Sequence, residues 1–285
     1  MAPCIVFIGG GNMCEAILSG ILKTGHPTSH VRVSEPFDKR RDYLRSTYKV
    51  DVCESNNDAI TGNGAEASKG VKADVVVLAV KPQVVGDVVR GVAASLVAGK
   101  PLVISIVAGV AIRDFARWIN GAVPIVRLMP NTPALVGEGA AGMYAEASVT
   151  QQQKQQAEYV AQNIAKEFFW VEREAGIDAV TAISGSGPAY FFLILEAMER
   201  AGQQVGLPQD VAKRLAAQTA LGAARMALTS EDDVATLRRK VTSPNGTTHA
   251  AIERMIELKV PEGIEGGVLA CRARCESLSE EFGKL

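Results

Sequence analysis

The stretch Cys4-Ile5-Val6-Phe7-Ile8-Gly9-Gly10-Gly11-Asn12-Met13-Cys14 decides the fold of the first half of the chain. A short apolar strand runs into three glycines, and a helix is expected to begin directly after them. Gly9 permits a tight turn, and Gly11 lets the backbone approach a ligand. A helix N-terminus adds free N–H groups and a positive dipole end. The stretch therefore predicts a turn that binds the pyrophosphate of a dinucleotide, and a tight turn without a ligand is the alternative.

Apolar runs and amphipathic stretches alternate outward from this turn. We expect strands at residues 31–34, 50–53, 74–80, 102–107 and 125–129, and helices at residues 12–24 and 83–96. These strands are apolar throughout, which is typical of a parallel sheet covered on both faces. The predicted fold class is α/β, with an N-terminal Rossmann-like domain that contains a mainly parallel sheet. Residues 55–73 interrupt the pattern, and their glycines and small polar residues predict a flexible loop.

The end of the second expected strand is where dinucleotide-binding domains read the adenosine ribose. The sequence there is Ser34-Glu35-Pro36, with Lys39, Arg40 and Arg41 downstream. Ser34 and either arginine are compatible with the 2′-phosphate of NADPH. Glu35 would instead accept a hydrogen bond from the free 2′-OH of NADH and would repel a phosphate. The two signals conflict, and the basic run is also compatible with a solvated helix face.

Helical patterns replace the strand signals after Val171. We expect helices at residues 188–201, 208–228, 233–240, 247–258 and 263–281. Residues 189–198 (AYFFLILEAM) are apolar nearly all round, so they must be buried. A small bundle cannot cover so much apolar surface alone, which predicts a subunit interface. The predicted domains are residues 1–172, which bind the dinucleotide, and residues 173–285, which are all helical.

Composition excludes several classes of function. The 285 residues contain 30 basic and 31 acidic side chains, so no strong general attraction to nucleic acid or to an anionic membrane is expected. No signal peptide and no uncharged apolar run of membrane-spanning length is recognised. The five cysteines are scattered and odd in number, which is typical of reduced structural thiols and predicts a cytoplasmic location. The three histidines form no cluster, so no metal site is predicted.

Further motifs go beyond a generic dinucleotide-binding fold, and the last two are more specific than the glycine turn. They are Ala79-Val80-Lys81-Pro82, residues 105–110 (SIVAGV), residues 129–135 (MPNTPAL), residues 185–190 (GSGPAY) and residues 243–248 (SPNGTT). In this order and spacing the sequence resembles the pyrroline-5-carboxylate reductase family, whose members catalyse the last step of proline biosynthesis. The resemblance covers essentially the whole chain. It implies a helical domain that forms homodimers, which in this family commonly assemble into decamers. Ser34 and the Arg40–Arg41 pair favour NADPH as cofactor, and Glu35 favours tolerance of NADH.

The resemblance also implies roles for individual residues. For the cofactor, Gly9, Gly11, Asn12 and Met13 hold the phosphates, Ser34 and Asn56 face adenosine, and Ala79, Lys81, Pro82, Ala108, Pro130 and Asn131 lead to the nicotinamide. For the substrate, the loop residues are Ser243, Asn245, Gly246, Thr247 and Thr248, with Glu231 near them. The sequence departs from the family pattern in three places. Cys14 replaces glycine or alanine, Asn245 replaces glycine, and the loop at residues 61–73 is longer than usual.

Hydride transfer to a C=N bond needs few protein groups, because the cofactor carries the hydride. Backbone N–H groups of residues 245–248 are expected to bind the substrate carboxylate. Thr248 is the predicted catalytic contact to the ring nitrogen, and Thr247 ranks second. No histidine, cysteine or carboxylate pair suggests a general acid, which fits an imine that enters already protonated. The alternatives are a reductase for another small cyclic imine or carbonyl compound and a non-catalytic dinucleotide-binding scaffold.

Overall fold

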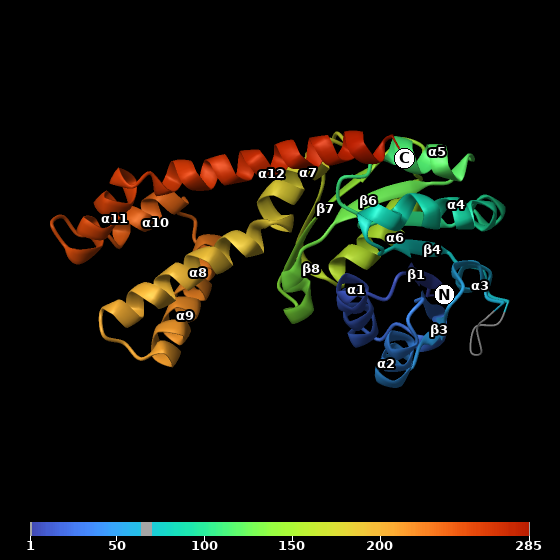
Figure 1. The fold of residues 1–285 in the computed structure, drawn as a ribbon, viewed down its shortest axis with the longest axis horizontal. Coiled ribbons are helices and arrows are strands. Elements are labelled where there is room, and N and C mark those ends of the chain that lie inside the picture. The colour runs from blue at the N-terminus through green and yellow to red at the C-terminus, as the bar shows by residue number, and fades with distance from the viewer. Residues whose placement is uncertain (1, 64–69, 285) are drawn as a thin grey trace. The chain divides into compact units, whose positions relative to one another are not determined.

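The structure is a computed structural model that describes residues 2–63 and 70–284. The chain forms two compact units, one from Met1–Ser186 with Cys271–Leu285 and the other from Gly187–Ala270 (Figure 1). These units group the segments differently from the predicted domains, residues 1–172 and 173–285. Helix α7 (Gly176–Val180) packs on strands of the first unit and buries Ile177. The last helix, α12 (Val260–Phe282), begins in the second unit and ends in the first.

An eight-stranded sheet forms the centre of the first unit. Its strands are β1 (Ile5–Ile8), β2 (Val31–Ser34), β3 (Asp51–Cys53), β4 (Val75–Leu78), β5 (Leu102–Ser105), β6 (Ile125–Met129), β7 (Gly139–Ala145) and β8 (Ala165–Trp170). They follow the order β3-β2-β1-β4-β5-β6-β7-β8. Strands β1 to β6 are parallel, β7 runs antiparallel to β6, and β8 is parallel to β7. The predicted Rossmann-like, mainly parallel sheet is therefore confirmed, with two strands beyond those expected.

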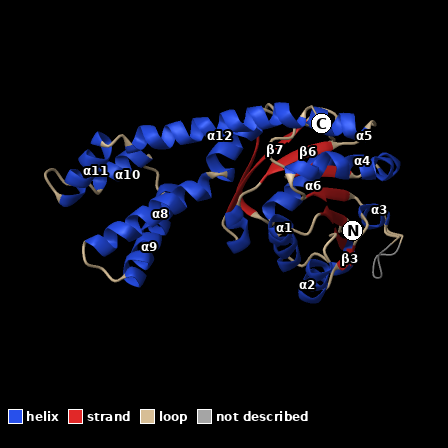
Figure 2. Ribbon diagram, viewed as in Figure 1, coloured by secondary structure: helices blue, strands red, loops and turns tan. Residues whose placement is uncertain are grey.

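Helices cover both faces of this sheet (Figure 2). On one face lie α1 (Asn12–Lys23), α2 (Asp38–Tyr48) and α6 (Gln151–Gln162), and on the other lie α3 (Asn56–Thr61), α4 (Pro82–Gly99), α5 (Ile112–Ile119) and the end of α12. Because side chains alternate along a strand, Ile5 and Phe7 enter the first core whereas Val6 and Ile8 enter the second. Two short 3₁₀ turns, η1 (Thr28–His30) and η2 (Thr132–Val136), and a π-helical turn, η3 (Thr181–Gly185), complete the unit.

Helix α3 corrects the prediction of a flexible loop at residues 55–73. Ser55 caps this helix, because its hydroxyl accepts a hydrogen bond of 3.2 Å from the Asp58 amide. Ala59 and Ile60 are buried in the core, and Gly62 ends the helix with φ +80°. The Ser55 cap and the burial of Ala59 and Ile60 stabilise this helix. The glycines that led to the prediction of a loop all lie after it. Residues 64–69 of the predicted loop lie outside the described residues.

The second unit is entirely helical, as predicted. It contains α8 (Gly187–Gln204), α9 (Gln209–Thr229), α10 (Val234–Lys240), α11 (Thr247–Glu257) and the first part of α12. Of its residues, all of which the structure describes, only Gly187, Ala212 and Ala216 are buried. Phe191, Phe192 and Leu193 of α8 are 64%, 65% and 64% exposed. This unit therefore has almost no core within one copy of the chain.

One helical run in the described residues, Gly176–Gln204, is long and apolar enough to span a membrane by length and composition alone. That qualifies the expectation of no such run. A single helix of this kind is weak support for a membrane span. Its second half carries Glu196, Glu199 and Arg200, which would be costly in a bilayer.

His26 makes the stability of the first unit sensitive to acid. Its ring is 5% exposed, its Nδ1 lies 2.8 Å from the Tyr159 hydroxyl, and its Nε2 has no hydrogen-bond partner among the described residues. Burial lowers the pKa of His26 below its ordinary value of 6.5 and outweighs the backbone groups of His30 and Pro3, which act to raise it. The unfolded chain then binds a proton more readily than the folded one. The free energy of unfolding that His26 contributes is therefore fully present above about pH 6.5, and it is lost as the pH falls below that value.

We expect His26→Gln to flatten the decline of Tm between about pH 7.5 and 5.5, where most carboxylates stay ionised. Differential scanning calorimetry at several pH values measures this slope. His249→Gln, on α11 of the second unit, is the matched control and should keep the wild-type slope. Equal slopes for wild type and His26→Gln would show that another group controls the acid response.

Candidate active site

The strand order reverses direction between β1 and β4, and in such sheets ligands bind at this point, beyond the carboxyl ends of the strands. The turn Gly9–Gly11 follows β1 there. Gly9 has φ +98°, and a Cβ added to it would lie 2.7 Å from the Ala79 carbonyl oxygen. Only glycine allows this approach. The glycine turn and the loop after β4 therefore meet as the two walls of one site.

The N-terminus of α1 is open toward this site. Its N-cap, Gly11, has no side-chain cap hydrogen bond, and no heavy atom lies within 4 Å of the place its Cβ would occupy. Gly11 and Asn12 are exposed and Met13 is half-buried. The free N–H groups and the space above Gly11 fit a pyrophosphate.

Cys14, at the third position of the glycine pattern, is fully buried in the core. It serves as the small residue that lets α1 pack on the sheet. Burial raises the pKa of its thiol far above the ordinary value, so the sulfur stays protonated. The departure from glycine or alanine at this position therefore leaves the turn intact and adds no reactive group.

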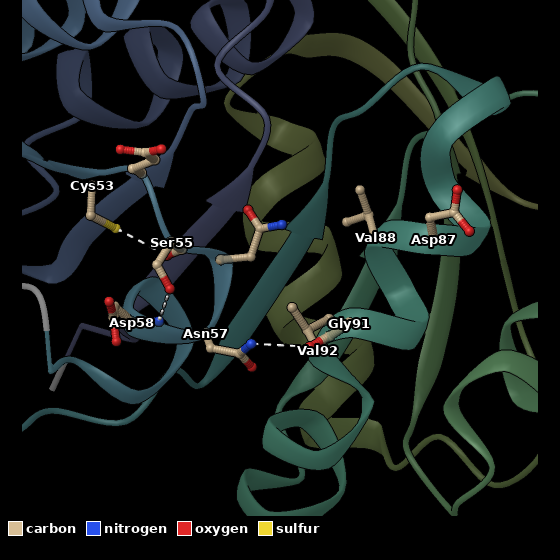
Figure 3. Close-up of a pocket in the computed structure, with 10 residues that line it drawn as sticks. Cys53, Ser55, Asn57, Asp58, Asp87, Val88, Gly91 and Val92 are labelled. Atoms are coloured by element: carbon tan, nitrogen blue, oxygen red, sulfur yellow. Dashed lines mark hydrogen bonds between the residues drawn. The ribbon is translucent and has the colours of Figure 1, made fainter.

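Ser34 and Asn56, the predicted adenosine contacts, are hydrogen-bonded to each other. The Ser34 hydroxyl donates to Asn56 Oδ1 over 2.6 Å, across the carboxyl ends of β2 and β3. A cavity of about 670 Å³ opens beside Asn56, between residues 53–58 and residues 87–92 of α4. Figure 3 shows Ser55 bonded to Asp58 and Asn57 reaching Gly91 across this cavity. The volume lies in the usual range of small-molecule pockets.

The charged residues after β2 bond to the chain itself. Glu35 is buried, and its carboxylate accepts hydrogen bonds from the amides of Gly10 and Phe37 over 2.9 and 3.0 Å. Arg41 donates to the carbonyls of Glu35 and Pro36. The side chains of Arg40 and Arg41 are 26% and 15% exposed, which excludes the solvated-face interpretation for both, whereas Lys39 is exposed and fits it.

The residues predicted near the nicotinamide lie at the ends of β4, β5 and β6. Lys81 is exposed and precedes Pro82, which starts α4 at its first helical position. Ala108 is half-buried in the turn after β5. Pro130 and Asn131 follow β6 and are buried. The structure thus brings all twelve predicted cofactor residues to one edge of the sheet.

Asn131 has a further structural role that the sequence reasoning missed. Its Nδ2 donates to the Ser184 carbonyl over 3.1 Å, and its Oδ1 accepts from the Ala140 amide over 2.9 Å. The side chain therefore ties the end of β6 to β7 and to the π-helical turn η3. The sequence did contain a signal for this role. An asparagine that closely follows an apolar strand is expected to be buried, and buried amides are nearly always hydrogen-bonded.

The predicted substrate loop lies in the second unit. Asn245 has φ +59°, a left-handed conformation that asparagine tolerates. The Gly246 amide donates to the Ser243 carbonyl over 3.0 Å, and Gly246 is the N-cap of α11 without a side-chain cap. Thr247 and Thr248 are exposed, and within the described chain their hydroxyls make no hydrogen bond. The loop thus presents free amides and two free hydroxyls.

Glu231 is exposed in the turn between α9 and α10. Within the described residues no hydrogen bond links its carboxylate to residues 243–248. The structure therefore places this predicted substrate residue in the same unit as the loop, without a hydrogen bond or ion pair to residues 243–248 in the described part of the chain.

Known proteins resemble this chain over its whole length. The family model for pyrroline-5-carboxylate reductase dimerisation matches residues 174–278, and the model for F420-dependent NADP oxidoreductases matches residues 4–109. A pyrroline-5-carboxylate reductase of Pseudomonas aeruginosa is 43% identical over 284 residues, which cover 99% of each chain. The chain belongs to the pyrroline-5-carboxylate reductase family. Another member of the family, from Pasteurella multocida, is 40% identical over 282 residues and 99% of each chain.

Solved pyrroline-5-carboxylate reductases share the fold. The structure from Coxiella burnetii has a TM-score of 0.87 and 38% identity, covering 98% of this chain and 99% of the other. The Plasmodium falciparum enzyme, solved with NADP bound, has a TM-score of 0.85 and 26% identity, covering 97% and 98%. The apolar run Gly176–Gln204 falls inside the family's dimerisation region. A subunit interface therefore accounts for its exposed apolar side chains, and this family member is an oligomer.

Proposed function

We propose that this chain reduces pyrroline-5-carboxylate to L-proline, the last step of proline biosynthesis, with NADPH as preferred cofactor and NADH as a slower alternative. The similarity to pyrroline-5-carboxylate reductases over 99% of the chain carries the proposal. The open glycine turn and the loop with two free hydroxyls support it, because they supply a dinucleotide site and a site for a small carboxylate. A non-catalytic scaffold would have no need of the hydroxyls.

The chain's own groups have simple tasks in this reaction. The bound nicotinamide supplies the hydride. The amides of Gly11, Asn12 and Met13 hold the pyrophosphate, and the loops after β4, β5 and β6 direct the ring. The amides at the start of α11 bind the substrate carboxylate. Thr248 hydrogen-bonds the ring nitrogen, and no general acid is required because the imine enters protonated.

The cofactor assay tests the reaction and the cofactor preference together. With pyrroline-5-carboxylate we expect oxidation of both cofactors and a higher kcat/KM for NADPH. Ser34 at the end of β2 is compatible with the 2′-phosphate of NADPH. The NADP bound to the Plasmodium falciparum relative supports the same preference. A kcat/KM for NADH tenfold or more above that for NADPH, equivalent to roughly 1.4 kcal/mol, would reverse it.

Two outcomes of this assay would replace the proposal. A six-membered cyclic imine carboxylate turned over faster than the five-membered one would make the chain a reductase for another ring size. No oxidation of either cofactor with any imine would leave the non-catalytic scaffold.

We propose homodimers that associate further into decamers, and a cytoplasmic enzyme that binds neither nucleic acid nor membrane. The net charge of −1 and the five free cysteines are consistent with this. Light scattering distinguishes the mass of ten chains from that of two.

A further inference from the structure

The backbone amide and the backbone carbonyl of Gly10 each form a hydrogen bond with a charged side chain. Its amide donates to Glu35 Oε2 over 2.9 Å, and its carbonyl accepts from Arg40 Nε over 2.6 Å. Gly10 is the central residue of the glycine turn. Glu35 and Arg40 lie 25 and 30 residues further along the chain, after β2 and on α2. Hydrogen bonds to charged groups are about twice as strong as neutral ones.

The packing around Gly10 leaves the turn little freedom. A Cβ on Gly10 would lie 2.7 Å from Leu44 Cδ1 and 3.0 Å from Glu35 Oε2. Gly10, Glu35 and Leu44 are all buried. The second Glu35 oxygen accepts from the Phe37 amide over 3.0 Å, so the carboxylate is fixed at both oxygens.

Arg40 also neutralises an acidic group close to the expected phosphates. Glu15 stands in the first turn of α1, and Arg40 Nη2 donates to its Oε2 over 2.6 Å. The hydroxyls of Tyr43 and Tyr48 donate to the other oxygen, each over 2.7 Å. Partial burial alone would raise the pKa of Glu15, but these donors outweigh it and lower the pKa. The carboxylate is therefore ionised and drawn back toward α2.

We propose that Glu35 and Arg40 are positioning residues that hold the phosphate-binding turn in its binding shape and do not select between NADPH and NADH. The inference rests on the proposed use of these cofactors. Both side chains occupy the sequence positions where the ribose is read, yet both are directed to Gly10. The pyrophosphate that this turn binds is common to the two cofactors. Loss of either side chain should therefore weaken both cofactors equally.

The test compares Glu35→Gln and Arg40→Met with wild type in the full-length protein. The Kd values of NADPH and NADH are measured without imine by quenching of protein fluorescence. We expect both Kd values to rise about three- to tenfold, with their ratio unchanged within about twofold. In the reaction, KM for the cofactor should rise while kcat at saturation stays near wild type. Arg45→Met is the control, because Arg45 also lies on α2 but bonds to Asp42 and Val52, and its Kd values should not change.

Three results would overturn the proposal. Weaker binding of NADPH alone in Arg40→Met would make Arg40 a reader of the 2′-phosphate. Weaker binding of NADH alone in Glu35→Gln would make Glu35 a reader of the ribose. Unchanged Kd values in both variants would show that the turn keeps its shape without them. Arg40 is partly exposed, so its variant tests the proposal even if the buried Glu35→Gln does not fold. A wild type that binds both cofactors but reduces no imine would refute the proposed function and leave this test intact.

Discussion

Replacing Phe192 with aspartate is expected to abolish the dimer at low micromolar concentration. Phe192 is 65% exposed on α8, inside the region that matches the dimerisation model of the family. A partner subunit would bury this side chain, and an unpaired carboxylate in an apolar interface is costly. We expect the dissociation constant of the dimer to rise at least a hundredfold, about 2.7 kcal/mol.

The same substitution should unfold part of the second unit. Within one chain this unit buries only Gly187, Ala212 and Ala216, so its helices depend on a partner for their core. Light scattering should give the mass of one chain, and circular dichroism should show a loss of helix. Val136→Asp is the control, because Val136 is 77% exposed in η2 of the first unit. An active wild-type monomer, or a Phe192→Asp variant of unchanged mass, would contradict this assignment of the interface.

Replacing Thr248 with valine is expected to lower kcat/KM for the imine at least tenfold, about 1.4 kcal/mol. Valine keeps the shape of threonine and removes the hydroxyl. The hydroxyl makes no hydrogen bond within the described chain, so its loss should not destabilise the loop. A neutral hydrogen bond is worth about 0.5–1.5 kcal/mol, and more where water is excluded. The Kd of NADPH should stay near the wild-type value.

Thr247→Ala provides the comparison within the same loop. Thr247 is also exposed at the start of α11, and we expect its loss to cost less than that of Thr248. Steady-state kinetics with both variants, together with cofactor titration, separate the two roles. If Thr248→Val kept the wild-type kcat/KM, or lost cofactor binding instead, Thr248 would only be part of the helix start.

The sequence predicted the centre of the sheet well, because a fully buried strand leaves a clear pattern. Strands β2 and β6 match the expected residues 31–34 and 125–129. Strands β4 and β5 end earlier than expected, at Leu78 and Ser105. The apolar residues beyond them turn out of the sheet and form the loops that line the candidate site. Strand β7 was not anticipated, since its sequence GAAGMYA has few of the branched residues that favour strands.

The direction of a polar side chain was harder to predict than its position. The sequence placed Glu35 directly after a strand and Arg40 on the helix that follows, and the structure has both there. Their hydrogen bonds, however, go to Gly10, a partner far away in the sequence and on another strand end. Such contacts depend on the packing of α2 against α1, which no local pattern encodes. The position of Thr247 and Thr248 at the start of α11 was easier to predict, because a loop at a helix start leaves hydroxyls and amides free.

The path of α12 has a consequence for the order in which the protein folds during translation. The ribosome completes β1 to β8 long before it adds Cys271–Leu285, the segment that belongs to the same compact unit. Leu278 and Phe282 of that segment pack into the core beside α5. Until they emerge, the part of that core beside α5 that Leu278 and Phe282 fill stays uncovered while the helices of the second unit are synthesised. Each newly made chain thus exposes two apolar surfaces at the same time. The end of α12 covers the first once it has been synthesised, and a second chain covers the other.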